Sequence, residues 1–306
     1  MKTNDRARIK KYLSILCCPN CTSDLHFKAN KFLCKKCKTS YPYKKGIPVF
    51  VSSKTSTEHM DKQAQIYDRE YAQAKYAYVL ENWQLSYIKR TAEIFGITTK
   101  QAARERIYLD IGAGPGHTVI ELAKLGVLTV GCDISYAGAV QAMRLAKRQK
   151  VYDRCLYVVC DAAQLPFKKN TIDYVTCIML LEHLENDGEV VSEMARVLRK
   201  KGKVYIAVPN TYWHFWVFMW PINYWHDRRL GHLRHYSKNS IISLAREHGL
   251  NNPRVFYSAH LIKFVQLFYK KLPATVQDRA WWKMEQIDES QHNARTGLHL
   301  NAVFTK

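Results

Sequence analysis

The sequence is short of acidic residues, and this deficit narrows the range of partners. Its 306 residues include 47 Lys and Arg but only 26 Asp and Glu, which gives a formal net charge of +21 at pH 7. Such an excess favours anionic partners, either nucleic acid or an anionic membrane surface. It carries no information about the fold.

Long apolar runs are also absent. The N-terminus, from Met1 to Lys11, is polar and basic and lacks the apolar region of a secretory signal peptide. No segment approaches the roughly 20 apolar residues that a membrane-spanning helix needs. Without a secretion signal, the nine cysteines indicate reduced thiols in a cytoplasmic protein rather than a disulfide scaffold. Internal repeats and low-complexity tracts are absent too, and a hydrophobic content of 47% predicts a folded chain.

Four of the nine cysteines form two C-x2-C pairs, Cys18 with Cys21 and Cys34 with Cys37, separated by twelve residues. Two such pairs bring four thiolates to one ion and close a tetrahedral zinc site, which is structural rather than catalytic. We therefore predict a zinc ribbon with a basic N-terminal tail over residues 1–53. The small polar residues that follow predict a linker over 54–60.

From Ile107 onward, short apolar segments alternate with helical patterns, as in a parallel sheet built from βαβ units. Residues 61–306 are therefore expected to form a doubly wound α/β domain with a seven-stranded, mostly parallel sheet. A helical pattern over 61–95 predicts two helices before the first strand, and the last strand is expected at the edge of the sheet. The strands are expected near 107–111, 127–132, 156–160, 172–177, 203–208, 253–258 and 297–304. The helices among them are expected near 116–125, 135–149, 186–198 and 238–248.

The first of these strands runs into a glycine-rich loop, in which Asp110 is followed by Gly112, Gly114 and Gly116. Glycines let the chain turn sharply and let a ligand reach backbone N–H groups at a helix N-terminus. A dinucleotide fingerprint, G-x-G-x-x-G, would need its third glycine where His117 stands. The loop is therefore not a dinucleotide-binding loop of this type.

Acids end the next two strands. Asp133 is placed where a carboxylate accepts both hydroxyls of a ribose, and Asp161 where it meets the amino group of an adenine. Two acids in this order, after such a loop, predict a nucleoside-containing cofactor.

The D-x-G-x-G-x-G loop, the two acids and the segments 181–184 and 198–202 resemble the type 11 methyltransferases, the family that includes ubiquinone- and menaquinone-biosynthesis enzymes. The resemblance covers about residues 105–250. It implies a class I fold and S-adenosylmethionine (SAM) as methyl donor. Asp110 would lie near the amino acid portion of the donor, Asp133 at its ribose, and Asp161 with Ala162 at its adenine.

The N-terminal module resembles a short zinc-ribbon family related to methyltransferase activator subunits, through its Cys-Pro-x-Cys pair and the tail at residues 41–50. A zinc module fused to such a domain also occurs in guanine-N1 methyltransferases of ribosomal RNA. Their second metal pair includes a histidine, whereas here it is Cys34 and Cys37.

Methyl transfer from a sulfonium is an in-line displacement, so the alignment of the reactants matters more than a pair of catalytic acids and bases. His183, just beyond the fourth strand, is the first candidate base; alternatively, it packs the following helix together with Glu182. His232 and His235, after the fifth strand, are candidates to hold the acceptor. Some quinone O-methyltransferases of the family bind a divalent metal through an extra acid three positions before the Glu-His pair. Met179 stands there, so the resemblance implies no metal.

The aromatic stretch 212–225 is too short to span a bilayer, but its composition is typical of a membrane interface. Aromatic and basic residues are also adjacent in the sequence at 264–271 and 281–283. These features favour O-methylation of a lipid-linked or membrane-proximal small molecule by a cytoplasmic protein that docks on the membrane. Three alternatives stay open: the aromatics form a buried lid, the substrate is an RNA base held in a basic groove, or the chain is a non-catalytic SAM-binding scaffold or activator. The oligomeric state is not predicted.

Overall fold

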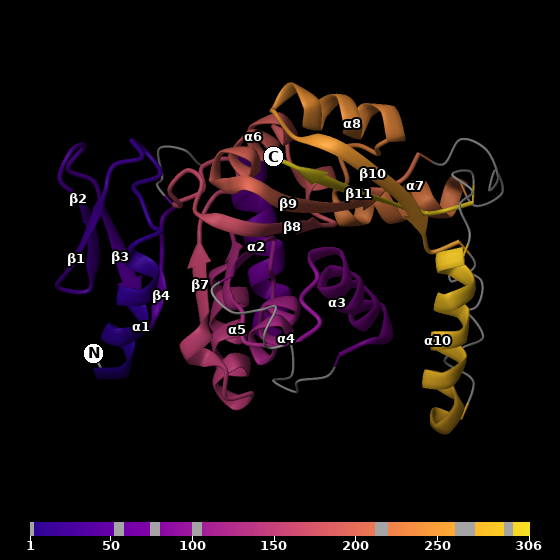
Figure 1. Cartoon of the computed structure of the whole chain (residues 1–306), viewed down its shortest axis with the longest axis horizontal. Helices are drawn as coiled ribbons and strands as arrows, with labels where there is room; N and C mark the ends of the chain where they lie inside the picture. The colour runs from indigo at the N-terminus through magenta and orange to yellow at the C-terminus, as the bar shows by residue number, and fades with distance from the viewer. Residues whose placement is uncertain are drawn as a thin grey trace.

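A seven-stranded sheet forms the centre of the computed structural model, which describes residues 3–51, 58–73, 80–99, 106–211, 220–260, 273–290 and 296–306 (Figure 1). The strands lie in the order β10-β11-β9-β8-β5-β6-β7. They are β5 (Ile107–Ile111), β6 (Leu128–Asp133), β7 (Cys155–Val159), β8 (Ile172–Ile178), β9 (Leu198–Pro209), β10 (Asn251–Ser258) and β11 (His299–Thr305). Strands β5 to β9 pair in parallel, whereas β11 runs antiparallel to both of its neighbours. The predicted doubly wound, mostly parallel α/β sheet is therefore confirmed.

The predicted place of the last strand is wrong. β11 lies between β9 and β10, so β10 forms the edge of the sheet. The residues explain this order, because β11 is buried continuously from Leu300 to Phe304, as a central strand requires. β10 instead begins with the exposed Asn251 and Asn252 and with Pro253, residues that are common on edge strands.

Helices cover both faces of the sheet (Figure 1). One face carries α3 (Asn82–Phe95), α4 (His117–Lys124) and α5 (Tyr136–Arg148), and the other carries α6 (Asp187–Val197) and α8 (Lys238–Glu247). The predicted pair of helices before the first strand is present as α2 (Glu58–Gln73), which packs on α5, and α3. Beyond the N-terminal module, the remaining described helices are α7 (Trp220–Leu230), α10 (Ala274–Ser290) and the short 3-10 turns η1 (Tyr152–Arg154) and η2 (Leu181–His183).

The N-terminal module lies beside β7 at one end of the sheet (Figure 1). It consists of α1 (Thr3–Leu13) and a four-stranded sheet of β1 (Leu25–Lys28), β2 (Lys31–Cys34), β3 (Ser40–Lys44) and β4 (Ile47–Pro48). Val49 forms a parallel bridge with Val159 of β7, and the Phe50 N–H donates to the Val159 carbonyl at 2.7 Å. The module thus covers a strand that would otherwise expose unpaired backbone groups.

The module and the large domain share one hydrophobic core. Phe32, Tyr41 and Phe50 belong to the same buried cluster as the strands of the central sheet. Arg8 is also buried and donates to the carbonyl of Cys155 at 2.9 Å. The boundary that we predict at 54–60 stays a prediction, because residues 52–57 lie outside the described part of the chain and α2 begins at Glu58.

Candidate functional site

A cavity of about 300 Å³ opens at the carboxyl ends of β5 to β8. From β5 the chain winds outward in one direction through β6 and β7, and in the other through β8 and β9. Open α/β sheets bind ligands at such a switch point. The described residues that line the cavity come from the loops after these strands and from the helices α2 and α3 above them.

The glycine-rich loop forms the floor of the cavity. Gly112, Gly114 and Gly116 have φ angles of 76°, 49° and 74°, in the left-handed region that favours glycine. A Cβ at Gly114 would lie 2.7 Å from the Tyr71 hydroxyl, so this glycine also provides space. Gly112 and Gly114 line the cavity, whereas Gly116 begins α4 and lies outside the lining. A Cβ there would meet Tyr157 at 2.7 Å, so Gly116 serves close packing against β7.

Asp133, at the end of β6, holds this loop in place. Its Oδ2 accepts a hydrogen bond from the Gly114 N–H and its Oδ1 one from the Ser135 N–H, both at 2.8 Å. Each carboxylate oxygen has further acceptor capacity for a ligand hydroxyl in the cavity. Burial raises the pKa of Asp133, and the two backbone donors partly offset this rise.

Asp110 lies at the end of β5 and is buried. Its Oδ1 accepts a hydrogen bond from the Thr176 hydroxyl at 2.5 Å, and this hydroxyl in turn contacts that of Tyr108 at 2.5 Å. Burial raises the pKa of Asp110 to about 7. Near neutral pH the carboxyl group therefore exists in both protonation states.

Asp161 and Ala162 line the cavity just beyond β7. Asp161 Oδ1 accepts a hydrogen bond from the Ala163 N–H at 2.8 Å, which fixes the turn. Burial raises the pKa of this carboxyl group as well. The three predicted acids thus lie around a single cavity, at the ends of three adjacent strands.

Helix α2 covers the loop, and the sequence analysis did not identify its contribution. Tyr67 and Tyr71 stack on each other, with ring centroids 5.9 Å apart, and both line the cavity. Asp68 fastens the helix: its Oδ1 accepts hydrogen bonds from the Ser135 hydroxyl at 2.5 Å and from the Ala137 N–H at 3.0 Å. The i, i+4 spacing of the two tyrosines was the available signal, since it places both rings on one helix face.

The three candidate histidines come together, but only His183 lines the cavity among the described residues. The ring of His183 lies edge-on to that of Tyr67, at 6.4 Å between centroids, and 4.8 Å from the ring of His232. Asp227 of α7 connects the other two: its Oδ1 lies 2.8 Å from His232 Nδ1 and its Oδ2 lies 3.0 Å from His235 Nε2. Asp227 was not among the predicted site residues.

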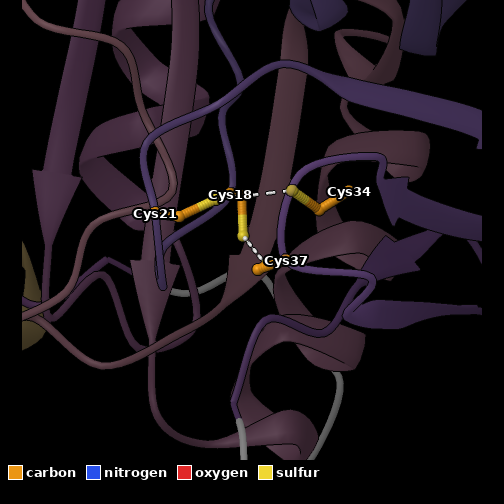
Figure 2. A group of neighbouring side chains, drawn as sticks. All are labelled: Cys18, Cys21, Cys34 and Cys37. Carbon is orange, nitrogen blue, oxygen red and sulfur yellow. Dashed lines mark hydrogen bonds between the residues drawn. The ribbon is translucent and has the colours of Figure 1, made fainter.

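The four cysteines of the N-terminal module also meet. Their sulfur atoms all lie within 4.8 Å of one another, with 3.5 Å between Cys18 and Cys37 and 3.4 Å between Cys21 and Cys34 (Figure 2). Thiolates around one zinc ion, at about 2.3 Å each, lie roughly 3.8 Å apart in a tetrahedron. The donor set and its spacing therefore fit a zinc ion.

A second cavity, of about 270 Å³, lies beside the first and shares Trp83 and Tyr87 of α3 with it. Trp281 of α10 forms part of its wall, together with a buried ion pair in which Arg90 and Glu285 lie 2.9 Å apart. Trp281 belongs to a cluster that we expected on a docking surface. That expectation is wrong for this residue, which is 3% exposed and donates its indole N–H to the Ser86 hydroxyl at 3.1 Å. Burial against α3 satisfies both its ring and its N–H group.

The aromatic stretch 212–225 is described only from Trp220 onward, and the cluster 264–271 lies outside the described residues. In the described part, Tyr224 and Trp225 of α7 are 64% and 63% exposed. Arg228 and Arg229 lie over these two rings. Among the described helices, none is both long enough and apolar enough to cross a membrane.

Part of the chain is similar to known proteins. Residues 109–206 match the type 11 family model described as a methyltransferase domain. A demethylmenaquinone methyltransferase of Corynebacterium glutamicum is 35% identical over 103 residues, which are 34% of this chain and 41% of that protein. The match thus spans about two fifths of that relative. The family-model match includes the glycine-rich loop and the acids that line the cavity.

Solved structures share the fold at low sequence identity. A geranyl diphosphate C-methyltransferase from Streptomyces coelicolor matches with a TM-score of 0.58 and 13% identity, over 82% of this chain and 98% of that one. The [4+2]-cyclase SpnF matches with a TM-score of 0.54 and 15% identity, over 82% and 97%. Residues 109–206 are therefore similar to a methyltransferase domain, and the sheet that contains them has the fold of these solved structures.

Proposed function

We propose that this protein is a SAM-dependent methyltransferase. The observation that carries the proposal is the convergence of a glycine loop and three acids at the switch point of the sheet, inside the segment that matches a methyltransferase domain. Asp133 would accept the ribose hydroxyls of SAM, and Asp161 with Ala162 would meet its adenine. Asp110 would face its amino acid portion, and the backbone of Gly112 and Gly114 would allow close approach.

The reaction needs alignment more than acid–base catalysis, because the sulfonium donor is already activated. Tyr67 and Tyr71 cover the loop and would limit the entry of water around the donor. His183 reaches the same cavity beside Tyr67 and is our candidate to accept the proton of a hydroxyl acceptor. His232 and His235 would act behind it, since neither lines the cavity among the described residues.

Calorimetric titration of the purified protein with SAM tests this proposal. We expect micromolar binding by the wild type, sharply weakened in Asp133→Ala and unchanged in Asp153→Ala, which removes an exposed acid elsewhere. A folded wild type that binds no SAM would refute the methyltransferase proposal. It would favour a scaffold or another chemistry, as the fold shared with a cyclase illustrates.

We further propose a small, apolar, membrane-proximal acceptor that is methylated at oxygen. Three observations support it: the adjoining second cavity with its aromatic wall, the exposed Tyr224 and Trp225 beside arginines, and the relative that acts on demethylmenaquinone. Aromatic rings with cations are suited to an anionic lipid interface. The same charges and rings would serve an RNA substrate, which is the second candidate.

Vesicle binding separates these two candidates. We expect the double variant Tyr224→Ser and Trp225→Ser to lose about tenfold in affinity for anionic vesicles while turnover of a soluble acceptor is kept. The result that favours RNA instead is methylation of RNA in trans, with an affinity that falls steeply as salt concentration rises.

A structural zinc ion in the N-terminal module completes the proposal. The spacing of Cys18, Cys21, Cys34 and Cys37 supports it, as does the core that this module shares with the sheet. We expect one tightly held zinc per chain, lost in Cys34→Ser and kept in Cys17→Ser, because Cys17 lies outside the cluster. An absence of zinc from the purified wild type would contradict this part.

A further inference from the structure

Glu182, at the centre of η2, is buried. Its side chain is fully inaccessible to solvent, and within the described part of the chain neither carboxylate oxygen accepts a hydrogen bond from another residue. Burying a carboxylate in this way is costly, and proteins usually pair it with a donor or a metal ion. The surroundings of Glu182 therefore have to supply a cation or a proton.

Two imidazoles surround this carboxylate. Glu182, His183 and His232 each offer one ligand atom, and the three atoms lie within 4.8 Å of one another. His183 follows Glu182 directly, whereas His232 comes from the segment after α7. The Leu233 N–H donates to the Glu182 carbonyl at 2.7 Å, so the main chain itself holds these two segments together.

Asp227 orients His232 for coordination. Because Asp227 Oδ1 engages Nδ1 of His232 at 2.8 Å, Nε2 is the nitrogen through which His232 would bind a cation. Carboxylates that hold the second nitrogen of a histidine in this way are typical partners of metal-binding imidazoles. His235 engages the other oxygen of Asp227 at 3.0 Å. Asp227 thus engages two histidines, whereas Glu182 accepts no side-chain hydrogen bond from a described residue and can bind an ion.

We propose that Glu182, His183 and His232 bind one divalent transition-metal cation, such as Mn²⁺ or Zn²⁺, on the acceptor side of the cavity. Ligand atoms at about 2.1 Å from one ion lie roughly 3.4 Å apart in a tetrahedron, so three atoms within 4.8 Å of one another have to approach by at most about 1.4 Å, which rotation of the side chains can supply. Two imidazoles and one carboxylate suit such a cation and leave coordination positions open. In the sequence, Met179 stands where some relatives have an acidic metal ligand, so no metal was expected. Here His232, from a distant segment, would supply the third ligand instead.

A catalytic role for this cation rests on the proposed function, whereas the binding site itself does not. The cation would bind the acceptor oxygen and lower the pKa of its hydroxyl group. The proton leaves to solvent, the oxygen forms a bond to the methyl carbon, and the C–S bond of SAM breaks to give S-adenosylhomocysteine. In this arrangement His183 would be a metal ligand and would orient the acceptor through the cation. The cation, and not His183, would then activate the hydroxyl group.

Titration of chelator-treated full-length protein with Mn²⁺, followed by electron paramagnetic resonance, tests the site. Four thiolates bind the hard Mn²⁺ ion poorly, so the signal would report on this cluster and not on the N-terminal cysteines. We expect one Mn²⁺ per wild-type chain. Glu182→Gln and His232→Asn should each bind it at least about tenfold more weakly. The matched control His248→Asn removes an imidazole outside the cluster and should bind as the wild type does.

Thermal unfolding supplies a second readout. Mn²⁺ should raise the melting temperature of the wild type and leave that of Glu182→Gln unchanged, because a ligand stabilises only the state that binds it. Without metal, Glu182→Gln should be at least as stable as the wild type, since it removes a buried charge. Failure of a folded wild type to bind Mn²⁺ or a second Zn²⁺ would overturn the proposal. Equal binding by both cluster variants would overturn it as well.

Measurement of SAM binding on the same samples separates this proposal from the proposed function. Donor binding without metal binding would reject the metal site alone. Metal binding without donor binding would reject the methyltransferase proposal and leave the metal site in place.

Discussion

The proposed donor side and the proposed acceptor side of the cavity are built differently. On the proposed donor side, Asp133 and Asp161 stand at the ends of strands and accept hydrogen bonds from backbone N–H groups, such as those of Gly114 and Ser135 to Asp133. On the acceptor side, His183, Tyr67 and Trp83 come from three separate elements, and their contacts are between side chains. Backbone geometry thus shapes the proposed donor site, whereas tertiary packing shapes the proposed acceptor side.

The largest expected effect is on SAM binding at the proposed donor side. Gly114→Ala should weaken SAM binding about 1000-fold, because its φ of 49° disfavours a side chain and the new Cβ would lie 2.7 Å from the Tyr71 hydroxyl. Gly249→Ala is the matched control, with a φ of 81° and no atom within 4 Å of the added Cβ. Calorimetry on both variants measures the difference. Equal loss in the two would indicate that backbone strain alone is responsible.

A smaller effect is expected on turnover when the proposed acceptor side alone is changed. His183→Asn should lower kcat by about 100-fold and leave the affinity for SAM within about twofold of the wild type, because we assign this imidazole to the acceptor and not to the donor. Steady-state kinetics together with calorimetry test this. A parallel loss of donor affinity would place His183 in the donor site and remove the contrast between the two sides.

The smallest expected effect concerns stability. The pKa of Asp110 rises from 3.8 to about 7 on folding, so the folded state binds more protons than the unfolded state between these values. Stability is therefore favoured at low pH by this group and decreases as pH rises, by roughly 2 kcal/mol between pH 5 and pH 7. In Asp110→Asn this contribution should vanish, which urea unfolding at both pH values can measure. An unchanged pH dependence in the variant would show that other groups cause it.

The sequence predicted the sheet well because its signals are local. Apolar strands and amphipathic helices repeat within short windows, and the glycine loop and acids mark the strand ends directly. The order of the last two strands could not be predicted in this way, because pairing partners are chosen across the sheet. Leu300 pairs with Val208, about ninety residues earlier in the chain.

The sequence by itself determined the class of the fold, the glycine-rich loop with its acids and the four-cysteine pattern. In each of these, the spacing along the chain dictates the geometry. Only the tertiary structure decided that α2 covers the loop, that Trp281 is buried, and that Asp227 and His232 gather behind His183. The physical reason is that these contacts join side chains from distant segments, whose proximity depends on how whole helices pack against the sheet and not on any local pattern.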